Sequence, residues 1–259
     1  MPQALPTALP LRLQTFLHLF RRSVAQALGP NLIGIYLLGS VLGRDFQRGS
    51  SDLDFLVVTR RPLTAHEGVR IQAMHRRLAR VSRWGSRLEG GYAARRRLRP
   101  WGILGRVPTV EGGRVDLQAP NDWTAENLMA LREQGVALLG PRPASVVPAV
   151  DTKALTRALD RYLRQLVRHR PRSAASAATV ALDIARCLYS AHTGRPSWKN
   201  EAAQWLEREV PTSRPLLAAA LAVHRGEATA RERRFVRARL PALQRSAQSL
   251  RRMITQRRA

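Results

Sequence analysis

Apolar positions in the first part of the chain predict one helix and two buried strands. Apolar residues recur at three- and four-residue steps from Leu11 to Ala27, a spacing typical of a helix, and Gly29-Pro30 then ends it. The run LIGIYLLG at 32–39 lies between turn residues, which favours a buried strand. After a polar, glycine-bearing stretch, DLDFLVVT at 52–59 has the same character. Two buried strands around a short loop predict a central sheet.

Helical spacing returns after the second strand and dominates the C-terminal half. Val69, Leu78 and Val81 are among the apolar residues that give 66–83 a helical stripe with a basic outer face. The stretch 85–120 is rich in Gly, Arg and Pro, and it predicts strands and loops. Long segments of Ala, Leu and Arg then predict helices at 122–138, 152–168, 174–192, 199–208, 213–224 and 228–256.

Prolines mark the predicted domain boundary. Pro141, Pro143 and Pro148 follow one another closely, which is typical of a linker. We therefore expect an α/β domain over residues 1–145 and an all-helical domain over 146–259.

Bulk composition favours a soluble, cytoplasmic protein. Hydrophobic residues make up 44% of the 259 positions, which is enough for a packed core. The lone cysteine, Cys187, excludes an internal disulfide and is expected to be a small buried side chain. The N-terminus lacks the pattern of a signal peptide, and no apolar run is long enough to cross a membrane.

The net charge of +26 is a weaker guide to function than its size suggests. A basic surface gains affinity for nucleic acid by releasing counterions. Here nearly all the positive charge is arginine, spread along the whole chain, and Lys153 and Lys199 are the only lysines. This pattern fits a general codon bias as well as it fits a selected patch, so a nucleic-acid partner is possible but not favoured.

Two aspartates at the start of the second strand carry the chemistry. Ser51-Asp52-Leu53-Asp54 begins eleven residues after Ser40, which with Gly39 follows the first strand. Side chains alternate along a strand, so Asp52 and Asp54 project to one side, about 6 to 7 Å apart, while Leu53 points into the core. Such a pair suits Mg²⁺, although two solvated acids at a strand end would look the same. The small residues of the Gly39-Ser40 turn let backbone N–H groups approach a phosphate closely.

A third carboxylate would complete the site. Glu89, in RLEGGY, is the best placed in sequence, and Asp116, in GRVDLQ, is the runner-up because it could also open a strand. Asp45 in the loop, Glu67 in the predicted helix and Glu111 beside a predicted turn are weaker rivals.

These elements together resemble a known family. Gly-Ser, a spacer and Asp-x-Asp on the next strand are similar to the signature of the polymerase-β-like nucleotidyltransferases. More closely, the chain resembles the aminoglycoside 3″/9-adenylyltransferases, the spectinomycin and streptomycin resistance enzymes. The segments that carry this resemblance are GIYLLGSVLGRDFQRGSSDLDFLVV, LEGGY, REQGVALLGPRP and ARCLYSAHTGRPSWKNEAAQWLEREVP.

The resemblance implies a fold and a set of roles. The fold class would be α+β, a polymerase-β-like nucleotidyltransferase domain with a mixed sheet followed by an all-helical C-terminal domain. The chain would act as a monomer on ATP and a small hydroxylated acceptor. Two Mg²⁺ ions would be held by Asp52, Asp54 and Glu89, with Glu89 as the catalytic base. The nucleotide would be bound by Gly39, Ser40, Ser51, Arg186, Lys199 and His224.

The chain departs from the family at the drug-binding positions. Acidic residues that contact the cationic drug align here with Arg172 and Ser176. The tryptophan that stacks on the drug has only Trp101 and Trp123 as candidates, and an aromatic residue of the nucleotide pocket aligns with His224. A strongly positive protein also attracts a polycationic drug poorly.

The sequence therefore favours transfer of AMP from ATP to a hydroxyl of an aminoglycoside or aminocyclitol antibiotic. Two alternatives stay open. The first is the same chemistry on a non-cationic acceptor, such as a nucleic acid end or a small metabolite. The second is a basic nucleic-acid-binding protein without catalysis, which the intact Asp-x-Asp disfavours.

Overall fold

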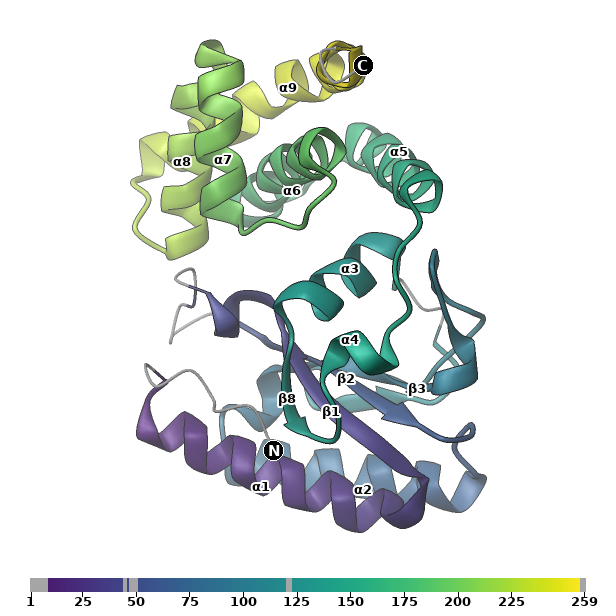
Figure 1. Cartoon of the computed structure of the whole chain (residues 1–259). Helices are drawn as coiled ribbons and strands as arrows, with labels where there is room; N and C mark the ends of the chain where they lie inside the picture. The colour runs from purple at the N-terminus through teal and green to yellow at the C-terminus, as the bar shows by residue number, and fades with distance from the viewer. Residues whose placement is uncertain (1–8, 44–45, 47–50, 120–122, 257–259) are drawn as a thin grey trace. The chain divides into compact units, whose positions relative to one another are not determined.

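A computed structural model describes the chain apart from residues 1–8, 44–45, 47–50, 120–122 and 257–259 (Figure 1). The chain divides into two compact units, Met1–Val150 and Asp151–Ala259. Each unit has a core of its own, so each is described separately.

The N-terminal unit is built on a six-stranded mixed sheet in the order β7-β6-β3-β2-β1-β8. Strands β2 and β3 pair in parallel, and the other neighbours pair antiparallel. The mixed sheet is confirmed, and so are the two predicted strands and the strands expected between 85 and 120. The strands are β1 Leu32–Leu38, β2 Leu53–Thr59, β3 Leu88–Ala94, β6 Thr109–Glu111, β7 Arg114–Asp116 and β8 Val136–Leu139.

Both faces of this sheet are covered, which explains why its central strands are apolar at nearly every position. Phe55 and Val57 belong to a core shared with α1 (Leu11–Leu28) and α2 (Ala65–Val81). Leu56 and Val58 point to the other face. That face is covered by α3 (Ala125–Gln134), α4 (Pro143–Val146) and the hairpin β4 (Leu98–Arg99) and β5 (Gly102–Ile103). The two pairs of helices lie on opposite sides of the sheet in Figure 1.

The helix predicted for 122–138 is wrong at its C-terminal end. Helix α3 ends at Gln134, and Val136–Leu139 forms strand β8 at the edge of the sheet. A Cβ on Gly135 would lie 2.3 Å from the carbonyl oxygen of Leu131, so the chain turns where only glycine fits. The Ala/Leu composition of 136–139 favours a helix. The segment forms a strand instead, because pairing with the open edge of β1 supplies hydrogen-bond partners for the backbone N–H and C=O groups of both strands.

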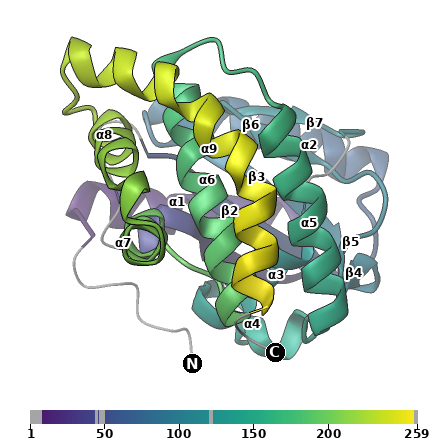
Figure 2. The same cartoon turned by 90° about the horizontal axis from the view of Figure 1, so that it is seen from above.

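The C-terminal unit is helical throughout its described part, and its predicted helices are confirmed. Helix α6 is the central element and packs against α5, α7, α8 and α9. In Figure 2, α6 lies between α9 and α8. Cys187 on α6 is fully buried, as expected. The helices are α5 Thr152–Arg168, α6 Ala174–Thr193, α7 Lys199–Glu209, α8 Arg214–Arg225 and α9 Ala230–Gln256.

None of the helices in the described ranges is long and apolar enough to span a membrane. Their apolar residues serve packing instead.

A buried histidine, His75, lies in the core of the N-terminal unit, on helix α2. The apolar face predicted for this helix is only partly confirmed. Val69 and Val81 of α2 are exposed, whereas Leu78 and His75 are buried. His75 Nε2 lies 2.8 Å from the hydroxyl of Tyr92, so a hydrogen bond ties α2 to β3. Burial lowers the pKa of His75 to about 4, and the ring is therefore neutral at pH 7.

This histidine makes the stability of the N-terminal unit depend on pH. Its pKa is about 4 in the folded state against 6.5 in the unfolded chain, so the unfolded state gains a proton first as the pH falls. The free energy of unfolding should fall between pH 6.5 and 4, by on the order of 3 kcal/mol in total. Chemical denaturation at several pH values measures this. His75→Gln should flatten the slope, whereas the exposed control His18→Gln should not, and equal slopes in all three proteins would contradict the assignment.

Candidate functional site

Three strands bring the candidate residues to one edge of the sheet. Leu38 at the end of β1 is paired with Asp54 on β2, and Asp54 is paired with Glu89 on β3. Because β1 runs antiparallel to β2 while β3 runs parallel to it, the end of β1 meets the starts of the other two strands. Neighbouring paired residues point to the same face of a sheet, so Asp54 and Glu89 are adjacent across the strands.

Gly39 is in close contact with this pair. It has a φ of +74° and begins the short 3-10 helix Gly39–Leu42, which contains Ser40. A Cβ at Gly39 would lie 1.8 Å from Oδ2 of Asp54 and 2.7 Å from its Cγ. The turn therefore needs glycine for its backbone conformation and for the close approach of the carboxylate. The predicted Gly-Ser turn and Asp54 thus form one local structure.

The predicted alternation of side chains at the start of β2 is confirmed for the core side. Leu53 is fully buried among the residues that face α1 and α2. Asp54 is half-buried on the opposite face, whereas Asp52 is exposed and precedes the first residue of the strand. Ser51 is buried, with 7% of its surface exposed. Within four residues, the segment thus has a buried serine, Ser51, and a carboxylate at the sheet edge, Asp54.

Glu89 is held at the same edge by close strand packing. It is exposed, and the next residue is Gly90, where a Cβ would lie 1.9 Å from the carbonyl oxygen of Phe55. The glycine allows β3 to approach β2 closely, which keeps Glu89 in register with Asp54.

The structure excludes Glu67 as the third carboxylate and separates the other rivals from the pair. Glu67 closes the capping box of α2 with Thr64 and pairs with Arg61. Burial alone would raise the pKa of Glu67, but hydrogen bonds from Thr64, Arg61 and Asn31 hold it below the usual value. Glu111 and Asp116 lie on the hairpin β6–β7, beyond β3, and Asp116 accepts a hydrogen bond from the backbone N–H of Gln118. Asp45 lies outside the described residues.

The donor chemistry of this edge fits an Mg²⁺ ion that takes only some of its ligands from the protein. Asp52, Asp54 and Glu89 offer hard carboxylate oxygens, and the absence of a side chain at Gly39 lets the Asp54 carboxylate lie against the turn. In the described ranges, no three His, Cys, Asp or Glu side chains gather closely enough to hold a metal by themselves. Mg²⁺ is commonly held by one or two carboxylates together with waters and substrate phosphates. The residues present therefore fit an ion that binds together with a nucleotide.

One of the two predicted cations of the C-terminal unit is bonded to the segment that leads to the other. Arg186 on α6 is partly buried, and its Nε donates to the carbonyl oxygen of Ser197, two residues before Lys199 begins α7. Its guanidinium also approaches Asp183 at 3.5 Å, and Asp183 accepts from the hydroxyl of Tyr162. The sequence prediction included neither Asp183 nor Tyr162. The contact of Asp183 with Arg186 could have been predicted from their three-residue spacing on a helix, which places two side chains on the same face.

The remaining family positions lie on different helices of the C-terminal unit. His224 is half-buried in the last turn of α8. Its neighbour Arg225 donates to the side-chain oxygen of Asn200, the second residue of α7. Arg172 is exposed before α6, and Ser176 lies in the first turn, where its N–H donates to the Ser173 cap.

The two candidate tryptophans differ in burial. Trp101 is 57% exposed in the turn between β4 and β5. Trp123 is half-buried, and its Nε1 lies 3.5 Å from the place a Cβ on Gly91 would take. Trp123 therefore packs near β3, two residues along from Glu89.

Two comparisons with known proteins found a match, one over the C-terminal part of the sequence and one over the fold of nearly the whole chain. Residues 145–248 match the family described as aminoglycoside adenylyltransferase, C-terminal domain. The structure is similar to that of spectinomycin adenyltransferase AAD(9) from Enterococcus faecialis, crystallised with ATP and spectinomycin. The TM-score is 0.73 at 18% sequence identity, and the match covers 91% of this chain and 99% of that chain. No curated protein sequence matches the chain significantly.

The match at residues 145–248 and the fold of the whole chain both point to the adenylyltransferases, a class of enzymes. The family match itself covers residues 145–248, which lie mostly in the C-terminal unit. The family resemblance and the fold class predicted from the sequence are thereby confirmed.

Gly39 provides a test of the geometry at the sheet edge. In Gly39→Ala the new Cβ would take the position of Oδ2 of Asp54, so the carboxylate must turn away. We expect AMP transfer from labelled ATP to fall by about 100-fold or more, since small displacements of a catalytic group cost that much. Gly112→Ala is the matched control, because Gly112 also has a positive φ but no atom lies within 4 Å of its added Cβ. Equal activity in the two variants would show that the contact with Asp54 is unimportant.

Proposed function

We propose that this chain is an Mg²⁺-dependent nucleotidyltransferase that transfers AMP from ATP to a hydroxyl of an aminocyclitol or aminoglycoside antibiotic of the spectinomycin or streptomycin type. As an ATP-dependent enzyme of this kind, it would act in the cytoplasm. The contact of Gly39 with Asp54, beside Glu89, is the single observation that carries the proposal.

In this proposal the N-terminal unit binds the reacting phosphate and removes the proton. The backbone of the Gly39 turn and the hydroxyls of Ser40 and Ser51 bind the triphosphate. Asp52 and Asp54 hold the metal with the nucleotide, and Mg²⁺ supplies charge neutralisation of the triphosphate and of the leaving pyrophosphate. Glu89 accepts the proton of the acceptor hydroxyl, whose oxygen forms the new bond to the α-phosphorus while the bond to pyrophosphate breaks.

The proposal assigns the phosphates a second set of ligands in the C-terminal unit. Arg186 is oriented by Asp183 and by the carbonyl of Ser197, so its guanidinium is held in one direction at little entropic cost. Lys199 follows closely in the chain and adds a point charge. His224 replaces a larger aromatic residue and would stack on the nucleotide base over a smaller area.

One observation favours a second acceptor class. Arg172 is exposed and Ser176 lies in the first turn of α6, at the two positions where the family has acids that contact the cationic drug. Neither side chain can pair with an ammonium or guanidinium group, and the net charge is +26. A non-cationic hydroxylated acceptor, such as a small metabolite or a nucleic acid end, is therefore the alternative substrate for the same chemistry.

The test of this function is an acceptor panel with labelled ATP and Mg²⁺. The panel holds spectinomycin, streptomycin and a short RNA, and we expect label on an antibiotic. Glu89→Gln should reduce turnover by about 100-fold or more, because it removes the base. Asp116→Asn, the same loss of charge on the same sheet, should leave the rate within about two-fold, as a surface change far from the reaction does. Label on RNA alone would select the alternative acceptor, and full activity of Glu89→Gln would refute the assigned base.

The two lysines form a natural pair for testing the nucleotide ligands. Lys199→Ala should raise the KM for ATP by about 10-fold or more, because a charge-assisted hydrogen bond to phosphate is lost. Lys153 lies in the first turn of α5 and is exposed, so Lys153→Ala should leave the KM for ATP unchanged. Steady-state kinetics with varied ATP measure both variants. An unchanged KM and kcat in Lys199→Ala would remove Lys199 from the site.

A further inference from the structure

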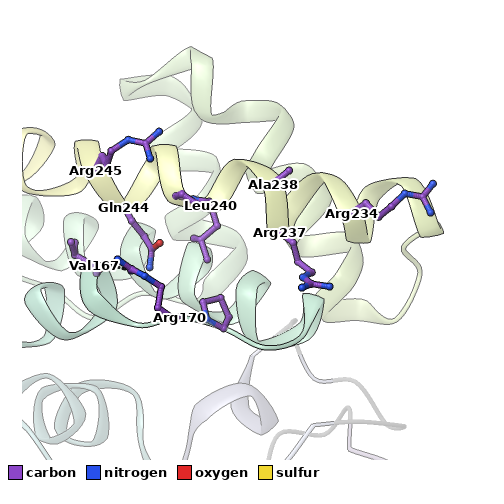
Figure 3. A pocket seen from close by; sticks show the side chains of 10 residues that line it. Val167, Arg170, Arg234, Arg237, Ala238, Leu240, Gln244 and Arg245 are labelled. Carbon is purple, nitrogen blue, oxygen red and sulfur yellow. Dashed lines mark hydrogen bonds between the residues drawn. The ribbon is translucent and has the colours of Figure 1, made fainter.

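A groove lined by arginines lies in the C-terminal unit, and none of the residues assigned to the nucleotide lines it. It runs between the end of α5, with the turn that follows, and one face of α9, as Figure 3 shows. Its volume is about 700 Å³, within the range of small-molecule sites. Arg170 lines it from the turn, and Arg234, Arg237 and Arg245 line it from α9.

The arginines of α9 share a face because of their spacing. Residues 234, 237, 241 and 245 follow one another at three- and four-residue steps, which places them along one side of a helix. Pro241 and Leu240 supply apolar surface between the charged positions. In Figure 3, Arg237 extends from α9 toward the segment opposite, which carries Arg170. The groove therefore presents guanidinium groups from both of its walls.

A buried glutamine fixes the two walls to each other. Gln244 of α9 is only 5% exposed, and its side-chain Nε2 donates to the carbonyl oxygens of Leu166 at 2.7 Å and His169 at 2.9 Å. These carbonyls belong to the end of α5 and the residue after it. The groove is thus formed before any ligand binds, which lowers the entropic cost of binding.

The electrostatics of the groove favour an anion. No acidic residue lines it. In the described part of the chain, none of its four arginines makes an ion pair with a carboxylate, and Arg170 donates to backbone carbonyls only. Like charges gathered in one groove repel one another, and an anion bound among them removes that repulsion.

We propose that this groove binds a compact anion that carries several phosphate groups. A guanidinium donates two parallel hydrogen bonds to phosphate oxygens, so arginines on two facing walls suit a ligand with more than one phosphate. The limited volume favours a small ligand over a long strand of nucleic acid, and the apolar wall at Leu240 and Pro241 suits a ligand that also has an organic part. The groove shares no lining residue with those assigned to the proposed transfer reaction.

Inorganic tripolyphosphate is the probe, and calorimetric titration of the full chain without divalent metal is the measurement. The double variant Arg170→Gln/Arg237→Gln removes one guanidinium from each wall and should weaken binding by about 10-fold or more. The control Arg231→Gln/Arg239→Gln removes the same charge from α9 outside the groove, and it should change binding by less than about two-fold. All four side chains are exposed, so neither double variant should disturb folding.

Three results would overturn the proposal. Equal weakening in both double variants would show attraction by the overall charge alone. Loss of binding in Lys199→Ala, with none in the groove variant, would place the probe at the nucleotide ligands instead. Groove-dependent binding of a short single-stranded RNA, without binding of tripolyphosphate, would make the ligand a nucleic acid backbone.

Discussion

The carboxylate of Asp54 lies where a side chain at Gly39 would have to be, and the arrangement of the N-terminal unit at its sheet edge depends on that contact. The positive φ of Gly39 ends β1 and turns the backbone across the start of β2. Parallel pairing then sets Glu89 beside Asp54, and Gly90 allows the strands to approach closely. The Gly39 turn and two carboxylates are thus brought together by strand register and by two glycines.

Much of this site could be predicted from the sequence because strand periodicity and motif spacing are local. Leu53 and Asp54 were expected on opposite faces, and Leu53 is fully buried in the core. The register of β3 could not be predicted from spacing, since it depends on which strand pairs with β2. Glu89 was therefore preferred over Asp116 on sequence position alone, and the pairing of Asp54 with Glu89 now supports that preference.

The errors in the fold prediction also arise from contacts between segments that are distant in the sequence. Strand β8 has a helix-forming composition, and only the open edge of β1 makes it a strand. The sequence pattern gave no sign that His75 of α2 is buried, but in the core its Nε2 lies within hydrogen-bond distance of the Tyr92 hydroxyl. In both cases a tertiary partner overrides a local preference. The helices of the C-terminal unit were predicted well because long amphipathic periodicity requires no such partner.

The central claim is that the edge formed by Gly39, Asp54 and Glu89 binds a divalent metal together with a nucleotide. Electron paramagnetic resonance of Mn²⁺, titrated with a non-hydrolysable ATP analogue, measures this directly. The account predicts that the analogue promotes Mn²⁺ binding to the wild-type chain and that Asp54→Asn abolishes this effect. Equal nucleotide-dependent Mn²⁺ binding in the wild type and Asp54→Asn would contradict the account.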